Sequence, residues 1–357
     1  MHDTLSDAVK SSNTVGMWPH SAVIAPNNFV YKSLSNWAFN IAVGCSHGCS
    51  FCYVPSAATI KQGPKLEQLG VKDPDLEWGK YVFLREWNEK LFLSSLRAAK
   101  ETPQEALARD GNRAVMYCTT TDPYQVFHHP DAKYRRELDA SARNLVRRSL
   151  ELIRDRSDLN VRILTRSPLA RVDFDLFKSF GPRLLFGMSV PTLDSRLARL
   201  YEPHAPGPEK RMKTLQAARD SGLHVYVAVA PTFPESDSDD LRATLRAVAE
   251  LNPITVFHEP INIRAENVVR IAARARELNV TPRTDVFASR EAWQDYAIKS
   301  FRCVQKLAKE VGLRNNQLHL WPDKALGSAA CVARARNPSD FQRWLQSCWS
   351  KVSRWPE

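Results

Sequence analysis

Short apolar runs alternate with longer amphipathic stretches over most of this 357-residue chain. The apolar runs are Phe39–Val43, Ala114–Cys118, Val161–Thr165, Leu184–Val190, Val225–Ala230 and Thr255–His258. The stretches with apolar residues at helical spacing are Tyr134–Arg154, Pro208–Ser221, Ser238–Leu251 and Ala265–Glu277. Strands that alternate with helices in this way predict an α/β fold built on a parallel sheet.

Polar, Gly or Pro residues follow nearly every predicted strand. These segments are Gly44, Thr119–Pro123, Arg166–Pro168, Pro191–Leu193, Pro231–Pro234 and Glu259–Asn262. In a parallel barrel the loops after the strands form the rim of the active site. We therefore expect Glu259 and Asn262 to contact a ligand there, with capping of the next helix as the alternative.

The two ends of the chain differ from this pattern. Residues 1–35 are polar, and we expect an irregular N-terminal extension before a barrel over residues 36–295. Residues 296–357 are predicted to form a basic helical C-terminal extension, with helices at Tyr296–Val311 and Ser339–Val352 and a loop at Leu318–Gly327.

The composition indicates the cellular compartment of the protein. No run of eighteen or more apolar residues occurs, so no membrane span is expected. The segment Met1–His20 lacks the basic start and apolar centre of a signal peptide, which predicts a cytoplasmic protein. Three of the seven cysteines crowd into eight residues, a pattern that favours metal binding over disulfides in a reducing compartment.

The formal charge of +11 is concentrated near the C-terminus. From Ile298 to Glu357 there are eleven Lys and Arg against four acids, a net +7. Such a surface attracts nucleic acid, although it is also compatible with a solvated face. Aromatic residues such as Trp344 lie between the charges, where they either stack on bases or pack onto the domain.

The crowded cysteines form a CxxxCxxC motif in the segment Ala42-Val-Gly-Cys-Ser-His-Gly-Cys-Ser-Phe-Cys-Tyr-Val-Pro55. Thiolates of Cys45, Cys49 and Cys52 can bind three irons of a 4Fe–4S cubane and leave the fourth open to a small ligand. Zinc is the alternative, but a closed zinc site needs a fourth ligand, which His47 could supply only through a tight loop.

This motif, with the aromatic Phe51 before its third cysteine, resembles the radical S-adenosylmethionine (SAM) superfamily. The resemblance implies a partial (β/α)6 TIM barrel with the cysteine loop after the first strand. It also implies that SAM chelates the open iron and is cleaved by one-electron reduction, and it assigns Phe51 to the cofactor site.

Four further segments resemble the spore photoproduct lyase-like, or DNA repair photolyase, branch of that superfamily. They are Cys118-Thr-Thr-Thr-Asp-Pro-Tyr124, Leu164-Thr-Arg-Ser167, Phe186-Gly-Met-Ser-Val-Pro-Thr-Leu-Asp194 and Arg199-Leu-Tyr-Glu-Pro-His-Ala-Pro-Gly-Pro-Glu-Lys-Arg211. Their order along the chain matches the branch.

The branch resemblance implies cofactor contacts at particular positions. A hydroxyl residue before the Asp that ends strand two contacts SAM, which corresponds to Thr120 or Thr121 beside Asp122. Arg166 takes the place of a Lys that meets the SAM carboxylate, and arginine also pairs with carboxylates.

Three more positions carry over on and after strand four. Ser189 corresponds to a serine on that strand, and Glu202 and Arg211 to the acid and base that follow it. A plain surface ion pair is the alternative for the last two.

The lyase itself uses a cysteine as hydrogen donor, relayed by tyrosines beside the cluster motif. Tyr53 fits one of these tyrosines, and Phe51 replaces the other. Cys118 lies near the donor position, so Tyr53 and Cys118 are the candidate catalytic residues. Counting back from Asp122, however, places Thr119 at the donor position, and a one-residue slip on a strand faces the opposite side, which favours the alternative that Cys118 is a buried small hydrophobe. This departure argues against literal reversal of thymine dimers.

The sequence thus predicts a radical SAM enzyme that receives an electron from ferredoxin or flavodoxin. Nucleic acid, DNA or RNA, or a nucleotide is the expected substrate, and the oligomeric state stays open. The alternatives are radical tailoring of a peptide or small natural product, and a nucleic-acid-binding protein whose cluster is structural or sensory.

Overall fold

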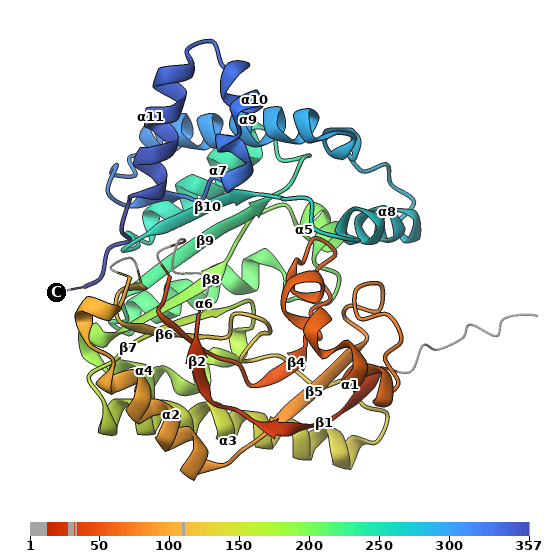
Figure 1. The fold of residues 1–357 in the computed structure, drawn as a ribbon, viewed down its shortest axis with the longest axis vertical. Coiled ribbons are helices and arrows are strands. Elements are labelled where there is room, and N and C mark those ends of the chain that lie inside the picture. Colours follow the sequence, from red (N-terminus) through yellow and green to blue (C-terminus); the bar gives the residue numbers. More distant parts are fainter. Residues whose placement is uncertain (1–12, 28–31, 33, 109–110, 357) are drawn as a thin grey trace, which may run out of the picture.

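The main feature of the fold is an eight-stranded sheet, seen in a computed structural model that describes residues 13–27, 32, 34–108 and 111–356 (Figure 1). In spatial order the strands are β11 (Leu318–Leu320), β10 (Val256–Pro260), β9 (Val225–Thr232), β8 (Leu184–Ser189), β7 (Asn160–Thr165), β6 (Ala114–Tyr117), β3 (Trp37–Phe39) and β2 (Ile24–Pro26). Neighbours are parallel except β2 and β3. The sheet does not close on itself, so the predicted partial barrel is confirmed.

The strands predicted from apolar runs appear at their expected places, with two differences. The run Phe39–Val43 is divided: Trp37–Phe39 pairs with β6 in the large sheet, while Ala42–Gly44 forms β4 in a second sheet. The expected loop at Leu318–Gly327 begins with β11, which pairs with β10 in parallel. A three-residue strand is too short to show a period in sequence.

The second sheet contradicts the expected irregular N-terminal extension. Its order is β1 (Thr14–Ser21), β5 (Tyr81–Glu86) and β4 (Ala42–Gly44). Trp18 is the buried residue of β1, so this strand forms because β5 offers it a partner rather than because of its own apolar pattern. Residues 1–12 of the predicted extension lie outside the described residues.

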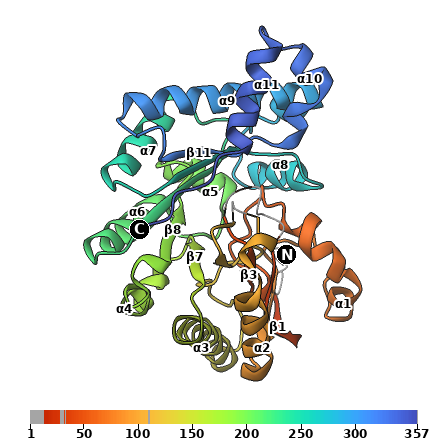
Figure 2. The ribbon, with the colours of Figure 1, turned by 60° about the vertical axis from the view of Figure 1, so that its left-hand side comes forward.

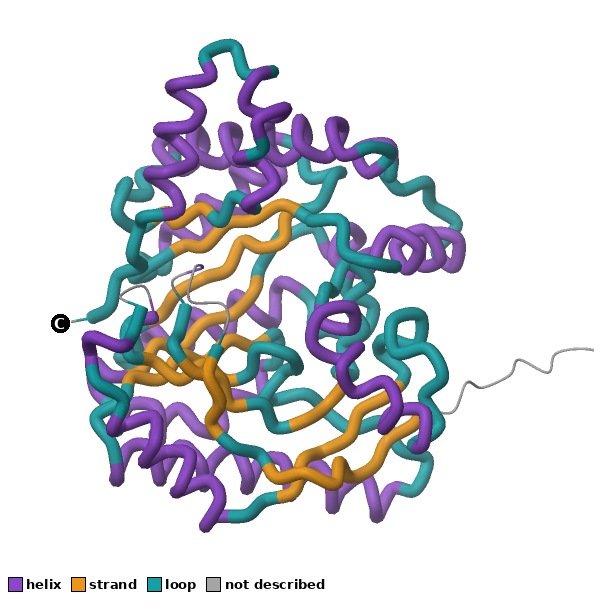
Figure 3. The backbone as a smooth tube through the Cα atoms, viewed as in Figure 1, coloured by secondary structure: helices purple, strands orange, loops and turns teal. Residues whose placement is uncertain are grey.

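Helices surround the two sheets (Figures 2 and 3). They are α1 (Gly63–Gln68), α2 (Glu89–Glu101), α3 (Ala132–Arg156), α4 (Phe174–Lys178), α5 (Ser195–Tyr201), α6 (Pro208–Asp220), α7 (Ser238–Glu250), α8 (Asn267–Glu277), α9 (Arg290–Glu310), α10 (Ala329–Ala333) and α11 (Pro338–Trp349). The longest helix, α3, buries one apolar stripe that includes Leu138, Leu145 and Leu152. Among the described residues, no helix is long and apolar enough to cross a membrane.

The aromatic residues of the C-terminal extension turn toward the protein. The ring of Trp321 stacks on Phe257 of β10 with 4.6 Å between centroids, and that of Trp344 packs edge-on against Phe301 of α9 at 6.1 Å. The ring of Trp355 lies 4.9 Å from the guanidinium of Arg162, which is fully buried inside the barrel. Of the two alternatives for these aromatics, packing onto the domain is therefore confirmed.

Candidate functional site

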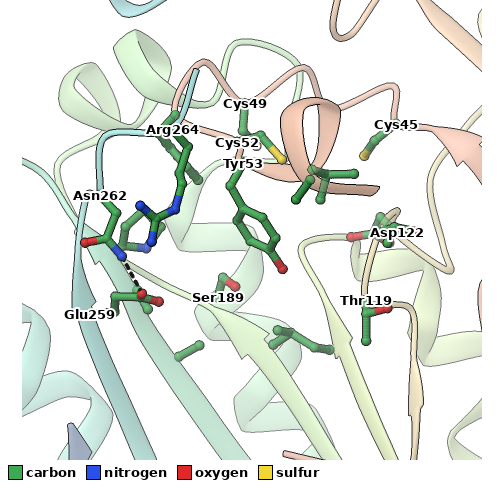
Figure 4. A pocket seen from close by; sticks show the side chains of 18 of the residues that line it. Cys45, Cys49, Cys52, Tyr53, Thr119, Asp122, Ser189, Glu259, Asn262 and Arg264 are labelled. Atoms are coloured by element: carbon green, nitrogen blue, oxygen red, sulfur yellow. Dashed lines mark hydrogen bonds between the residues drawn. The ribbon is translucent and has the colours of Figure 1, made fainter. Parts of the chain in front are cut away.

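A cavity of about 400 Å³ lies among the carboxyl ends of the parallel strands (Figure 4). It brings together eleven of the thirteen site residues predicted from sequence. These are Cys45, Cys49, Phe51, Cys52, Tyr53, Cys118, Thr120, Thr121, Asp122, Arg166 and Ser189. The residues converge because the carboxyl ends of parallel strands meet at one rim.

The cysteine loop turns sharply at two glycines with positive φ, Gly44 at +90° and Gly48 at +57°. A Cβ on Gly44 would lie 2.2 Å from the carbonyl oxygen of Tyr81, and one on Gly79 would lie 2.6 Å from Cα of Gly48. Larger residues are excluded from these positions, because the loop passes directly against the backbone of its neighbours.

The loop is also fixed by hydrogen bonds from two residues of α8. Arg270 donates to the carbonyl oxygens of Ser50 and Cys52 and forms an ion pair with Asp75. Asn267 donates from Nδ2 to the carbonyl oxygen of Phe51 at 3.3 Å. Sequence reasoning missed both residues, since on an amphipathic helix they read like any other polar positions.

The three cysteines suit a cubane cluster. Figure 4 shows Cys45 approaching the cavity from one side and Cys49 and Cys52 from the other. In the described ranges, no three His, Cys, Asp or Glu side chains converge as ligands of a single metal ion would. A cubane binds each thiolate at a different iron, so separated thiolates on one short loop fit it.

Burial controls the protonation of these cysteines. Burial raises the pKa of Cys49 to about 12 and also raises the pKa of Cys45 and of Cys52. In this environment thiolates are stable only with a positive group such as iron beside them. The loop therefore offers three thiols that a 4Fe–4S cluster would bind as thiolates.

Asp122 joins the cysteine loop to two strands. Its carboxylate accepts hydrogen bonds from the Thr165 hydroxyl at 2.7 Å and from the backbone nitrogens of Tyr124 and Arg166, both at 2.8 Å. Nδ1 of His47 lies 3.5 Å from the same carboxylate, and burial lowers the pKa of this histidine, which keeps its ring neutral. Asp122 thus has protein partners on several sides.

The two threonines that precede Asp122 have different surroundings. The hydroxyl of Thr121 donates to the carbonyl oxygen of Gly44 and accepts from Nε2 of Gln125, both at 2.6 Å. The side-chain oxygen of Gln125 accepts in turn from the nitrogen of Ser46 at 2.7 Å. Thr121 is therefore engaged in holding the cysteine loop, whereas Thr120 lines the cavity without such a bond among the described residues.

Glu202 lies buried between two arginines. Its carboxylate oxygens are 2.6 Å from Nε of Arg166 and 2.6 Å from Nη2 of Arg211. The side chains of Glu202 and Arg211 are 0% and 1% exposed, so the surface ion pair considered as an alternative is wrong. Burial alone would raise the pKa of Glu202, but Arg211 and Arg166 bring that pKa below its usual value.

This buried trio fixes Arg166 toward the cavity. Glu202 holds Nε of Arg166, and the guanidinium lies 5.8 Å from the ring centroid of Phe51, a cation–π distance. Arg211 does not line the cavity but donates to the carbonyl oxygen of Ser189 at 3.0 Å. Glu202 and Arg211 thus position the cavity-lining residues Arg166 and Ser189 without lining the cavity themselves.

Cys118 lines the cavity, in contrast to the expectation that it would face the opposite side from Thr119. Both residues reach the cavity because β6 ends at Tyr117, beyond which the alternation of a strand no longer applies. Burial raises the pKa of Cys118, so its sulfur stays a thiol. Figure 4 shows the Tyr53 ring extending into the cavity from below Cys52.

The opposite wall comes from β10 and the C-terminal extension. Glu259 accepts from Nδ2 of Asn262 at 2.8 Å and pairs with Nζ of Lys32 at 2.6 Å. Arg264 pairs with Asp323, and all five residues line the cavity. The side chains of Glu259 and Asn262 do not cap α8, which follows Glu266, so the capping alternative is wrong.

Comparisons with known proteins agree with this geometry. The family model of the Radical SAM superfamily matches residues 39–248. An uncharacterised protein of Acidianus two-tailed virus, ORF301, is 31% identical over 70% of this chain and 75% of its own length. An uncharacterised protein of Methanocaldococcus jannaschii, MJ0683, is 22% identical over 80% of this chain and 91% of its own.

Solved structures of spore photoproduct lyase share the fold. One, complexed with dinucleoside spore photoproduct, has a TM-score of 0.59 at 12% identity and covers 89% of this chain and 85% of that chain. Another, with bound AdoMet and dinucleoside spore photoproduct, has a TM-score of 0.58 at 11% identity over the same shares. Together with the cysteine loop at the mouth of an open parallel barrel, the match over more than half the chain shows that this protein belongs to the radical SAM superfamily.

Proposed function

We propose that this chain reductively cleaves SAM and removes a hydrogen atom from a nucleic acid or nucleotide. As a radical SAM protein it is an enzyme that uses a 4Fe–4S cluster and SAM and needs an external reductant. The observation that carries the proposal is the cavity, in which the cysteine loop faces strand-end groups suited to a charged ligand. When bound, the cluster and SAM supply one-electron reductive chemistry.

The residues divide between holding the cofactors and orienting them. Cys45, Cys49 and Cys52 would hold the cluster, and Arg166 would meet the SAM carboxylate, with Glu202 fixing its guanidinium. Of the two threonines before Asp122, Thr120 would contact SAM, because the hydroxyl of Thr121 is bonded to Gly44 and Gln125.

Further groups complete the site. Ser189 and Phe51 add a hydroxyl and an aromatic face to the cavity wall. Asp122, Thr121 and Arg211 act through other residues, since their polar atoms bind protein groups.

The substrate class rests on two supports. Spore photoproduct lyase, whose fold this chain shares, has been solved with a dinucleoside bound. The excess of Lys and Arg after Ile298 gives the chain a basic region that suits phosphates. Ferredoxin or flavodoxin, in the cytoplasm, is the proposed electron donor.

The experiment is a SAM-cleavage assay on anaerobically reconstituted protein reduced with dithionite. We expect about four irons per chain and release of 5′-deoxyadenosine, stimulated by DNA or RNA oligonucleotides. The variant with Cys45, Cys49 and Cys52 all replaced by Ala should lose both the irons and the product.

Other outcomes separate the alternatives. Stimulation by peptides but not by oligonucleotides would favour a tailoring enzyme. Oligonucleotide binding with a loaded cluster but no 5′-deoxyadenosine would favour a binding protein with a structural or sensory cluster.

A further inference from the structure

A second hollow lies away from the cluster cavity, between α9, α10 and α11. This hollow, the C-terminal groove, has an open volume of about 1100 Å³. Figures 1 and 2 show the three helices packed together at one end of the molecule, away from α2 and α3. The groove follows residue 248, where the match to the family model ends, so it belongs to the part of this chain outside the family's shared segment.

Five cationic side chains line the C-terminal groove. They are Lys299, Arg302, Lys306, Arg334 and Arg336. The two acids of the lining are engaged: Asp295 pairs with Arg334 at 3.5 Å, and Asp340 pairs with Arg343 and accepts from Asn337. Five cations against two acids leave the lining with a net positive charge, although Lys306 also lies 3.8 Å from Glu310, outside the lining.

The spacing of the cations on α9 suits a row of phosphates. Lys299, Arg302 and Lys306 follow at intervals of three and four residues, which places them along one face of the helix. At about 1.5 Å per residue the row is about 10 Å long. The cations are therefore close enough together to contact neighbouring phosphates of one strand, which rise by about 3.4 Å each along the axis of a B-form duplex.

A short segment connects the groove to the cluster cavity. Asp323 lines the cavity, and Arg334, eleven positions later, lines the groove. Gln294 of α9 fixes this segment, because it donates to the carbonyl oxygen of Ala325 at 3.0 Å and accepts from Arg334 at 2.7 Å. Eleven residues span at most about 40 Å when extended, so one nucleic-acid chain can reach both places.

We propose that the C-terminal groove binds the phosphate backbone of a nucleic acid whose reacting nucleotide enters the cluster cavity. This inference rests on the proposed function and names the surface that holds its substrate. Since the aromatics of the extension pack inward, phosphate contacts supply the affinity, and binding depends strongly on salt and weakly on base sequence.

The test compares two triple variants of the reconstituted protein. Lys299→Gln with Lys306→Gln and Arg336→Gln removes three exposed cations of the groove. Arg302 and Arg334 are kept, because Arg302 lies over the Trp344 ring and Arg334 binds Gln294. The control removes three exposed charges of α3, as Arg135→Gln, Arg136→Gln and Arg143→Gln.

Fluorescence anisotropy with a labelled 20-nucleotide single strand and its duplex would be measured from 50 to 200 mM salt. We expect the groove variant to lose about three units from the slope of log K against log salt, and to bind at least roughly tenfold more weakly at 100 mM. The α3 control should match the wild type, and both variants should still release 5′-deoxyadenosine from SAM without nucleic acid.

Each other result is decisive. If the groove variant binds as well as the wild type, the C-terminal groove is not the binding surface, while the proposed function stands. If the groove variant and the α3 control weaken binding to the same extent, the nucleic acid is attracted by the charge of the whole surface, and the C-terminal groove is not a specific binding surface. If the wild type binds neither oligonucleotide, the proposed substrate class fails together with the groove.

Discussion

Arg270 of α8 donates a hydrogen bond from Nε to the carbonyl oxygen of Ser50 over 3.1 Å, across 220 positions of sequence. The same guanidinium binds the carbonyl oxygen of Cys52 and pairs with Asp75. The backbone between the second and third cysteines is thus held by a helix from the far half of the barrel. A positive charge is also placed beside the loop, where it acts to lower the pKa of Cys52 against the effect of burial.

Arg270→Gln should therefore change the reduction potential of the cluster as well as the amount of iron that the protein binds. Hydrogen bonds and net charge near a cluster set its potential, and loss of a nearby cation destabilises the reduced, more negative form. We expect a lower midpoint potential in an EPR-monitored titration and less iron per chain after reconstitution. Arg270→Lys, which keeps the charge but not the forked hydrogen bonds, should load poorly yet keep the wild-type potential.

Arg274→Gln is the matched control, since Arg274 lies one turn later on α8 and pairs with Glu277. It should leave both the iron content and the potential unchanged. An unaltered potential in Arg270→Gln would show that Arg270 supports the fold without influencing the cluster.

Thr120 and Thr121 should respond differently to loss of the hydroxyl. Thr120→Val should weaken SAM binding by roughly tenfold, about 1.4 kcal/mol, because it removes a hydroxyl that faces the cavity. Thr121→Val should mainly lower the free energy of unfolding, by about 1–3 kcal/mol, because its bonds to Gly44 and Gln125 are lost. Calorimetric titration with SAM and urea unfolding of both variants would check this. If Thr121→Val weakened SAM binding and Thr120→Val lowered the stability instead, Thr121 would be the residue that contacts SAM.

The fold was predictable where its signals are local. Buried strands such as Leu184–Ser189 show as apolar runs, and the residues after them meet because parallel strands share one rim. The strand β1 was missed because its pairing with β5 is what stabilises it, and its sequence TVGMWPHS has neither a continuous apolar run nor a regular alternation. Arg270 was missed for a related reason: its partners lie 195 to 220 positions away, and nothing near it in sequence indicates them.

Glu202→Gln tests the buried ion trio through the pH dependence of stability. Removing one partner from a buried pair costs about 3–5 kcal/mol, so the variant should be destabilised by a similar amount at neutral pH. Because the native pKa of Glu202 lies below its usual value of about 4.5, its contribution is complete above pH 4.5. It is then lost as the pH falls through the lower native pKa, so the two proteins should converge in acid.

Unfolding free energies of wild type and Glu202→Gln between pH 3 and 8 would check this. A difference that stays constant down to pH 3 would mean that the charge of Glu202 does not contribute. Glu209→Gln is a suitable control, since Glu209 pairs with Lys213 on the surface and should matter little.

Cys118 is the expected hydrogen donor to a substrate radical, because it is the thiol that follows β6 and lines the cavity. In D2O its exchangeable hydrogen would be deuterium, so the product should gain one deuterium, detectable by mass spectrometry of the digested oligonucleotide. Burial raises the pKa of Cys118, which keeps the thiol protonated, so this transfer should persist as the pH rises to about 9.

Cys118→Ser should still release 5′-deoxyadenosine but lose the deuterium transfer, since a hydroxyl is a poor hydrogen-atom donor. Cys348→Ser, in α11 and outside the cavity lining, should behave as the wild type. Tyr53→Phe distinguishes the remaining cases, because Tyr53 extends into the same cavity. If Cys118→Ser transfers deuterium normally and Tyr53→Phe does not, the tyrosine donates directly. If both variants fail, the transfer depends on both residues.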